Sequence, residues 1–198
     1  MTRAGPPDRA SPRDDRELAE AIRRGDPRAF DRFFDRYGDA LLGHLTGMIG
    51  DRTGAEDLLQ ETMIRVWRKI EGYREQGAFR AWVFRIATNL ALTELRRARY
   101  ERAGMEEAGR ADARENSNPE REWIGKEREE RLEAALLSLP DDQRAVMLLR
   151  IRRGMGIREI AGILSVPEGT VKSRIHYAVR RLRLALGAER EADRETGS

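Results

Sequence analysis

Residues 157–183 read IREIAGILSVPEGTVKSRIHYAVRRLR, and the interpretation of the whole chain starts from this stretch. Apolar residues recur there at helical spacing in two runs, which a Ser-Val-Pro break separates: Ile157, Ile160, Ala161 and Leu164, then Val171, Ile175, Ala178 and Leu182. Pro167 suits the first turn of the second run, because proline has no amide hydrogen to donate and a fixed φ. The stretch therefore predicts two short helices joined by a tight turn.

The outer face of the second predicted helix is basic and rich in hydrogen-bond donors. Its residues are Thr170, Lys172, Ser173, Arg174, His176, Tyr177, Arg180, Arg181 and Arg183. The single acid of this helix, Glu168, comes early, where the helix dipole favours a negative charge. A helix-turn-helix that presents its second helix to DNA explains the pattern. An ordinary amphipathic helix pair with a solvated arginine face is the alternative.

Composition limits the class of protein. The chain has 198 residues, of which 39% are hydrophobic, 37% charged and 6% aromatic, a balance typical of small helical units. It has no cysteine and only two histidines, His44 and His176, so we expect neither a metal site nor another cofactor. No signal peptide and no run long enough to span a membrane is present, so we expect a cytoplasmic protein with no membrane insertion.

The N-terminal third predicts a tail and two helices. Residues 1–14 are rich in Pro, Gly, Ser and charge, which predicts a disordered tail, and a short helix is expected at residues 16–24. Asp26-Pro27 then opens a long helix. Its apolar stripe, predicted to be buried, is Phe30, Phe33, Phe34, Tyr37, Leu41, Leu45 and Met48. Gly38, Gly43 and Gly47 weaken this helix by roughly 1 kcal/mol each relative to alanine, so tertiary packing must hold it.

A well-patterned helix follows at residues 55–70, AEDLLQETMIRVWRKI. Thr53 and Glu56 have the spacing of a capping box before it. The predicted buried stripe is Ala55, Leu59, Met63, Val66 and Ile70. The opposite face carries Asp57, Gln60, Glu61, Arg65 and Arg68, a mixed-charge surface that suits a protein partner or is merely solvated.

Residues 72–77, GYREQG, form a loop by composition, and the helical pattern FRAWVFRIATNLALTELRRARY comes after them. The predicted buried side is Phe79, Trp82, Val83, Ile86, Leu90 and Leu95. Polar and basic residues occupy the other faces: Arg80, Arg85, Thr88, Asn89, Thr93, Arg96 and Arg97. Cations follow phosphates and a polar loop can receive a base turned out of the stack, so this region is suited to unpaired bases. Trp82 and Phe84 are expected in the core instead of serving as stacking platforms.

Periodicity is lost over residues 101–120, which predicts a flexible polar linker and a domain boundary. Helical patterns resume at Trp123 and again after Pro140, so the second domain is predicted to have four helices, with a charged tail at residues 188–198. The expected fold class is all-α. It comprises two small helical domains, residues 15–100 and 121–187, joined by the linker, and the second contains the helix-turn-helix.

Three stretches, taken in order, closely resemble the extracytoplasmic-function group of bacterial sigma factors: AEDLLQETMIRVWRKI, FRAWVFRIATNLALTELRR and LSLPDDQRAVMLLRIRRGMGIREIAGILSVPEGTVKSRIHYAVRRLR. The likeness covers roughly residues 16–186. The resemblance implies that residues 15–100, like sigma region 2, join core RNA polymerase and open the minus-ten region. It implies that residues 121–187, like sigma region 4, bind the minus-thirty-five element as duplex.

The resemblance also assigns residues. The face that would bind the clamp coiled coil of the largest polymerase subunit consists of Asp57, Gln60, Glu61, Arg65 and Arg68. The loop 73–78, with Tyr73, Arg74 and Gln76, would receive a flipped minus-ten base beside Arg80, Arg85, Thr88 and Asn89. Four residues of the second helix would reach base edges of the upstream element or the nearby backbone: Lys172, Ser173, His176 and Tyr177. Three others would contact phosphates: Thr170, Arg174 and Arg180. His176-Tyr177 departs from the usual pattern of the family, so the DNA sequence that is recognised does not transfer.

The first hypothesis is thus a transcription initiation factor without chemistry of its own. Its expected partners are core RNA polymerase, promoter DNA and an anti-sigma factor, with no small-molecule substrate. The second hypothesis is a free-standing helix-turn-helix repressor that dimerises on a palindrome, although the chain shows no heptad seam for a dimer. A helical enzyme is the third, and the chain has neither a glycine-rich phosphate loop nor a His-Glu-x-x-His motif. A scaffold protein is a further alternative.

Overall fold

The computed structural model describes residues 12–74, 78–107 and 124–196, and within these residues all regular elements are helical. The first domain contains α1 (Pro12–Arg23), α2 (Arg28–Ile49), α3 (Arg52–Lys69), the short turn η1 (Ile70–Gly72) and α4 (Phe79–Glu107). The second contains α5 (Ile124–Leu137), α6 (Asp141–Met147), the π turn η2 (Leu148–Arg152), α7 (Ile157–Leu164) and α8 (Glu168–Thr196). The predicted all-α fold with two small helical domains is confirmed.

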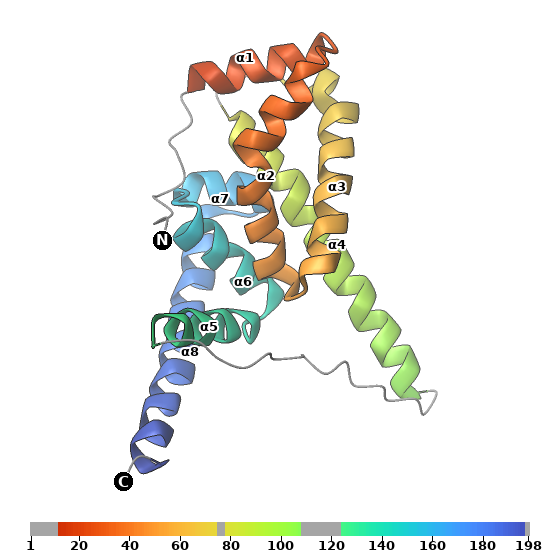
Figure 1. Cartoon of the computed structure of the whole chain (residues 1–198). Coiled ribbons are helices and arrows are strands. Elements are labelled where there is room, and N and C mark those ends of the chain that lie inside the picture. The colour runs from red at the N-terminus through yellow and green to blue at the C-terminus, as the bar shows by residue number, and fades with distance from the viewer. Residues whose placement is uncertain (1–11, 75–77, 108–123, 197–198) are drawn as a thin grey trace.

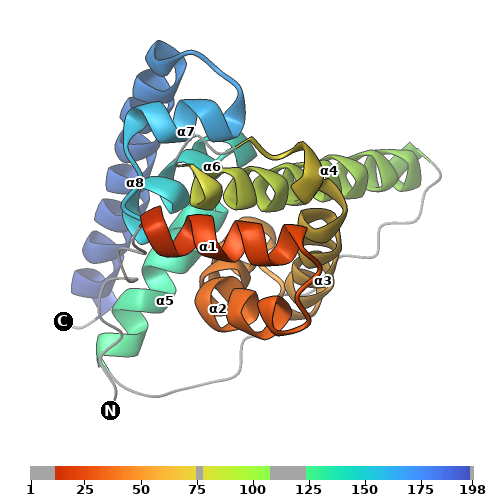
Figure 2. The same cartoon turned by 90° about the horizontal axis from the view of Figure 1, so that it is seen from above.

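In the first domain α3 and α4 pack against α2, and α1 lies across their ends (Figures 1 and 2). Phe33 of α2 is fully buried at the centre, where its ring meets Tyr37, Trp67 and Phe79. Aromatic pairs at tilted or edge-to-face angles add to the free energy that burial itself provides. The core of this domain is thus built from three consecutive helices, α2, α3 and α4.

Helix α1 is fixed to α2 by a buried polar contact. The Tyr37 hydroxyl donates to Asp15 Oδ1 at 2.7 Å, and Arg36 Nε donates to the same oxygen at 2.9 Å. Burial raises the pKa of Tyr37, and the neighbouring Asp15 carboxylate raises it further. The hydroxyl therefore stays protonated and keeps its role as donor.

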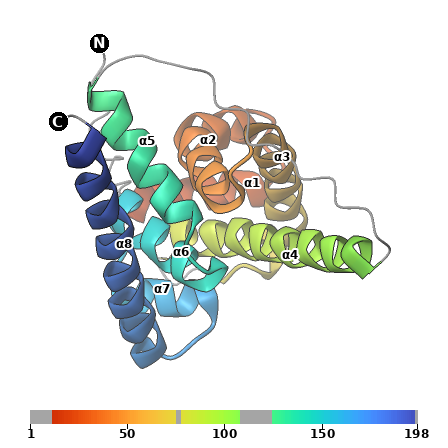
Figure 3. The same cartoon turned by 90° about the horizontal axis from the view of Figure 1, so that it is seen from below.

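The second domain is a four-helix unit, as predicted. Helix α6 continues into η2, which buries Leu148 and Leu149, and the chain then turns at Gly154, whose φ of 63° favours glycine. Helices α7 and α8 form the helix-turn-helix. Helix α5 lies beside α8 on the other side of the domain (Figure 3).

The two domains pack against each other through one continuous apolar core. Helix α7 lies on α4, while α5 and η2 lie on α2. The C-terminal ends of α4 and α8 project from this body (Figure 1).

Several helix boundaries differ from the sequence predictions. Helix α1 begins at Pro12, so residues 12–14 are helical and are not part of a disordered tail. Helix α4 continues to Glu107, so the first part of the predicted linker is helix, and residues 108–120 lie outside the described part of the chain. Helix α8 runs to Thr196 through most of the predicted tail. Alanine, glutamate and arginine, which favour helix, are frequent in the extensions of α4 and α8.

The start of α3 is also different. Asp51 is the N-cap, because its Oδ2 accepts a hydrogen bond from the Gly54 amide at 2.8 Å. The prediction of a capping box at Thr53 was therefore wrong by two residues. The buried stripe of α3, from Ala55 to Ile70, is confirmed.

Two aromatic residues of α2 were wrongly predicted to be buried. Phe30 and Phe34 are 47% and 48% exposed, whereas Phe33, Tyr37, Leu41, Leu45 and Met48 are buried as predicted. One residue along a helix rotates a side chain by about 100°, so positions 30 and 34 fall at the edge of the stripe that faces the core. Phe30 instead contributes to a surface described below.

Candidate nucleic-acid and protein interfaces

The turn of the helix-turn-helix is made by a left-handed residue followed by proline. Ser165 ends α7 with φ 54°, and the Val166 amide donates to the Ala161 carbonyl at 3.1 Å. The Pro167 carbonyl then accepts from the Thr170 amide at 2.9 Å, which starts α8. Val171, Ala178 and Leu182 are buried, so the orientation of α8 about its axis is fixed.

This orientation leaves the recognition strip uncovered, a name used here for Lys172, Ser173, His176 and Tyr177. All four side chains are exposed, and the Tyr177 side chain stands 54% exposed beside the His176 ring. Residues at i, i+1, i+4 and i+5 of a helix share one side, so the structure brings these four together as predicted. Arg180, Arg181 and Arg183 are exposed further along the same helix.

The two other residues predicted to contact phosphates in this domain are half-buried. Arg174 forms an ion pair with Asp142 of α6, which draws its guanidinium toward the domain. Thr170 is half-buried, and its carbonyl accepts from the Ser173 hydroxyl at 2.9 Å. The structure therefore does not place Arg174 and Thr170 on the uncovered strip.

In the first domain the predicted minus-ten residues are divided between surface and core. Arg74, Arg85 and Asn89 are exposed, whereas Tyr73 is buried, with its ring against Phe79 and Trp82. Gln76 lies outside the described residues. The loop therefore exposes Arg74 in the structure and keeps Tyr73 as part of the aromatic core.

Thr88 is fully buried, and its hydroxyl has a structural role. Its Oγ1 donates to the Phe84 carbonyl at 2.7 Å and lies 2.9 Å from His44 Nε2. Because the hydroxyl hydrogen is used on Phe84, Nε2 of His44 must be the donor to Thr88, and Nδ1 is left without a proton. The structure therefore places Thr88 in the core, away from any surface that DNA could reach.

His44 of α2 is a neutral histidine that is fully buried against Phe84 and Thr88 of α4. Complete burial lowers its pKa to about 3, and the positive charges of Arg153 and Arg152 of the second domain add to this shift. Nδ1 is buried with no hydrogen-bond partner, so a proton placed there would have no acceptor. His44 therefore belongs to the packing of α2 against α4.

The predicted protein-binding face on α3 is solvent-accessible. Asp57, Gln60 and Arg68 are exposed, and Glu61 and Arg65 pair with each other at 2.7 Å across one helical turn. Such exposed pairs stabilise a helix by only about 0.3–0.5 kcal/mol, so they leave the face available to a partner.

Beside this face lies an apolar groove that sequence patterns did not reveal. The docking groove, as it is called below, has a volume of about 420 Å³ and is lined by Phe30, Gln60, Met63, Ile64, Trp67 and Arg68. Ile64 is 45% exposed, and the Phe30 ring lies 5.5 Å from the Trp67 ring. A surface with exposed large apolar side chains beside polar ones is typical of protein interfaces. The spacing of Ile64 and Trp67 with Gln60 and Arg68 on α3 was the signal available in the sequence.

Within the described part of the chain, no group of three or more His, Asp or Glu side chains is arranged to hold a metal ion. None of the described helices is both long and apolar enough to cross a bilayer.

Comparison with known proteins identifies both halves of the chain. Residues 33–100 match the Sigma-70 region 2 family, and residues 129–182 match the Sigma-70, region 4 family. The chain is 33% identical over 173 residues to the RNA polymerase sigma-H factor of Pseudomonas aeruginosa, covering 83% of this chain and 89% of that protein. It is 34% identical over 172 residues to the ECF RNA polymerase sigma-E factor of Haemophilus influenzae, and the match covers 83% of this chain and 90% of that protein.

Solved structures share the fold. CnrH, in complex with the cytosolic domain of CnrY, has a TM-score of 0.67 and 25% identity, covering 88% of this chain and 97% of that chain. The sigma factor RpoE of Bartonella quintana, in complex with the anti-sigma factor NepR, has a TM-score of 0.65 and 24% identity, covering 81% and 98%. The second likeness concerns the fold alone.

Proposed function

Because this chain belongs to the extracytoplasmic-function sigma factors of RNA polymerase, we propose that its two domains divide polymerase docking and promoter reading between them. The chain is a sigma factor that directs RNA polymerase to promoters, so the hypothesis of a free-standing repressor is not favoured. Its partners are core polymerase and promoter DNA. The finer assignments below are our proposals.

The polymerase binds the first domain at the face of Asp57, Gln60, Glu61, Arg65 and Arg68 together with the docking groove. Charged residues at the rim orient a partner, while desolvation of a central apolar patch provides most of the binding free energy. The groove is contiguous with the predicted polar face, since Gln60 and Arg68 belong to both. This supports a single interface of which α3 is the centre.

The promoter is read by both domains. The recognition strip of α8 reads the minus-thirty-five element, and Arg180 contacts flanking phosphate. The minus-ten region is read by α4 with its preceding loop, through Arg74, Gln76, Arg80, Arg85 and Asn89. Burial of Tyr73 and Thr88 argues against a direct DNA contact by either side chain in this conformation.

The remaining assignments come from the family resemblance. The chain performs no chemistry of its own, binds no cofactor and takes no small-molecule substrate. An anti-sigma factor restrains it. Since the polymerase is its partner, the chain acts in the cytoplasm.

One observation carries the proposal: the docking groove and the recognition strip are both uncovered, and they lie on different domains. A molecule with one surface for a protein and another for duplex DNA can bring the two together. The test is transcription from a promoter library with core polymerase, with and without the chain. We expect promoter-specific transcripts only when both are present. Tight binding of the chain alone to palindromic DNA, with no effect on transcription, would instead favour a repressor.

The docking assignment has a matched pair of variants. Ile64 in the docking groove and Ile151 in η2 are 45% and 53% exposed, so glutamate at either position should leave the fold intact. Ile64→Glu should weaken core polymerase binding at least tenfold in a titration, because it buries a charge in the apolar contact. Ile151→Glu should not weaken it. Equal effects of the two variants would remove the groove from the interface.

The polar half of the interface is tested by Asp57→Arg combined with Glu61→Arg. This change reverses the charge of the face and opposes Arg65 with a like charge. Because it lies opposite the buried stripe, it should cost only about 1 kcal/mol of stability, from the lost Glu61–Arg65 pair and the like charges that replace it. We expect loss of polymerase binding with an unchanged circular dichroism spectrum. Retained binding of the polymerase at wild-type affinity would contradict the assignment.

A further inference from the structure

A large aromatic ring stands in the middle of an otherwise polar recognition strip. The Tyr177 side chain is 54% exposed, although tyrosine is among the residues that gain most from burial. Its neighbours on the strip are Lys172, Ser173 and His176, and Arg180 follows on the same helix. A partner that covers this strip must therefore offer an apolar group to the ring and polar groups around it.

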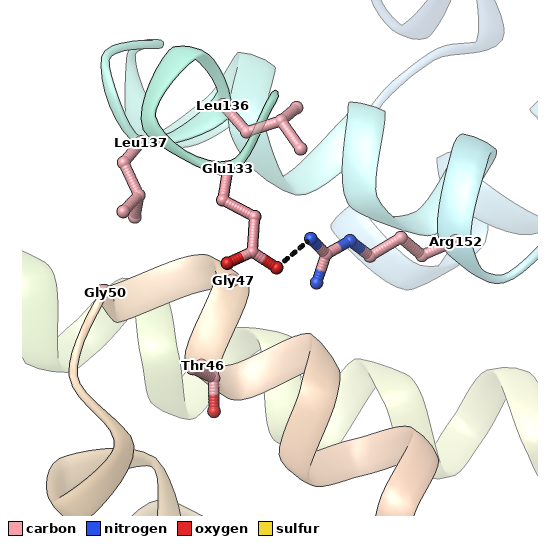
Figure 4. A pocket seen from close by; sticks show the side chains of 7 residues that line it. All are labelled: Thr46, Gly47, Gly50, Glu133, Leu136, Leu137 and Arg152. Atoms are coloured by element: carbon pink, nitrogen blue, oxygen red, sulfur yellow. Dashed lines mark hydrogen bonds and ion pairs between the residues drawn. The ribbon is translucent and has the colours of Figure 1, made fainter. Parts of the chain in front are cut away.

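The ring does not belong to a hollow into which a protein could insert. Tyr177 lines neither the docking groove nor the small pocket between α2 and α5. Figure 4 shows that this pocket is lined instead by α2, α5 and the Glu133–Arg152 ion pair. Tyr177 stands on the outer side of a single helix, which is a convex surface. The major groove of DNA, about 12 Å wide, admits a helix of this kind.

The direction of the Tyr177 ring is set by its surroundings. The next residue, Ala178, is fully buried, so the backbone of α8 cannot turn about its axis at this point. The His176 ring meets the Tyr177 ring nearly edge-on, at 77°, with 5.5 Å between the ring centroids. Tyrosine has only two side-chain torsions, so fixing its ring in a complex costs little entropy.

The polar neighbours of the ring are matched to the polar groups of base edges. Lys172 can only donate hydrogen bonds. The Ser173 hydroxyl donates to the Thr170 carbonyl at 2.9 Å, so it presents its lone pairs to a partner as an acceptor. Base edges in the major groove carry both acceptors and amino donors, which these two side chains can satisfy. The Tyr177 ring is left to contact something that is not polar.

The major groove offers one apolar group of substantial size, the C5-methyl group of thymine. The faces of the bases are stacked on one another in a duplex, so they are closed to an aromatic side chain. Over the amino or carbonyl edge of another base, the ring would remove a polar group from water without giving it a hydrogen bond, which is unfavourable. Against the methyl group both surfaces lose water without such a cost.

We propose that Tyr177, positioned by His176, recognises the C5-methyl group of a thymine in the minus-thirty-five element. The inference rests on the proposed function, in which α8 reads this element. It assigns the contact to the ring of Tyr177 and not to its hydroxyl. Burial of one methyl group corresponds to about a fourfold change in affinity.

The first experiment removes only the methyl group. Each thymine in the minus-thirty-five element of a promoter that the wild-type holoenzyme selects from a library is replaced in turn by deoxyuridine, which keeps the carbonyl groups and the base pairing. At one position the wild-type holoenzyme should bind the deoxyuridine promoter about fourfold more weakly. The Tyr177→Ala holoenzyme should bind both promoters equally, whereas Tyr177→Phe, which keeps the ring, should retain the wild-type ratio. Arg180→Ala is the matched control, because it should weaken binding to both promoters without changing their ratio.

The second experiment adds the methyl group to another base. The carbon that carries the methyl group of thymine has a counterpart in cytosine, so cytosine and 5-methylcytosine are compared at the same position. The wild-type holoenzyme should prefer 5-methylcytosine, and Tyr177→Ala should not distinguish the two bases. The positioning role of His176 is tested in the deoxyuridine comparison. His176→Ala should reduce the ratio to about twofold, and His176→Phe, which restores an aromatic edge, should recover the wild-type ratio.

Three results would overturn the inference. They are a selected minus-thirty-five element without any A·T pair, equal binding of the wild-type holoenzyme to the thymine and deoxyuridine promoters at every position, and a thymine preference that persists unchanged in Tyr177→Ala. An unchanged ratio in His176→Ala would overturn the positioning role of His176. Failure of the wild-type holoenzyme to select any promoter is a separate outcome, which would contradict the proposed function and the inference with it.

Discussion

The two surfaces proposed to read DNA differ in how they are built. The recognition strip comes from one helix, and all four of its side chains are exposed in the free chain. The minus-ten surface comes from α4 and its preceding loop, and the second domain engages Arg80 while Thr88 is in the core. A surface formed within one helix depends on local pattern alone, whereas a surface next to another domain depends on how the domains pack.

The strongest test of this contrast is the recognition strip itself. Lys172→Ala or Tyr177→Ala should relax selectivity among variant upstream elements by about 1–3 kcal/mol per base contact, because base-edge contacts discriminate between sequences. Neither change should alter the melting temperature by much, since both side chains are exposed. Promoter-library transcription measures the effect. An unchanged base preference in both variants would show that the strip does not read bases.

The second prediction concerns His44 at the boundary between the domains. The folded chain holds its pKa at about 3, whereas an unfolded chain takes up a proton near pH 6.5. Below about pH 6.5 the unfolded state therefore binds more protons, and stability falls as pH falls. This term should remove about 2 kcal/mol between pH 7 and pH 5, at about 1.4 kcal/mol per pKa unit.

Urea unfolding at the two pH values measures this term as a difference between variants. His44→Gln should lose about 2 kcal/mol less than the wild-type chain between pH 7 and pH 5, while His176→Gln, at an exposed position, should follow the wild type. Wild-type behaviour of His44→Gln would mean that His44 is not buried in solution.

The helix-turn-helix could be predicted because every signal for it is local. The apolar period, Pro167 and the basic outer face all lie within one stretch of 27 residues, 157–183. The long helices α4 and α8 extend beyond their predicted ends, and their helix-forming composition was a usable signal there. Local propensity therefore accounts for the elements of this fold.

The position of Thr88 could not be predicted in the same way. Its partner His44 lies 44 residues earlier, and nothing in the pattern of α4 distinguishes a polar residue with a buried partner from one that faces solvent. Phe30 shows the converse, because an exposed aromatic residue at the edge of the stripe has the same sequence pattern as one in the core. Long-range packing decides both cases.

The third prediction uses Thr88 to separate structure from DNA contact. Thr88→Val keeps the shape of the side chain but removes the acceptor for His44 Nε2, which should cost about 1–2 kcal/mol of unfolding free energy. Relative promoter preference should stay the same once the fraction folded is taken into account. A change of minus-ten preference without loss of stability would return Thr88 to the DNA surface.

The smallest effect is expected at the far end of α8. Arg180 lies one to two turns beyond the recognition strip and is exposed, so it should approach the phosphate backbone and no base edge. A phosphate contact weakens binding to all sequences about equally and contributes about one unit to the salt slope. Arg180→Ala should therefore lower holoenzyme binding to every promoter by a similar factor and flatten the salt dependence, while Lys172→Ala changes the order of preferred promoters. Transcription from the promoter library at two salt concentrations separates the two kinds of effect. If Arg180→Ala altered base preference and Lys172→Ala did not, the division of α8 into a reading part and a backbone-binding part would be reversed.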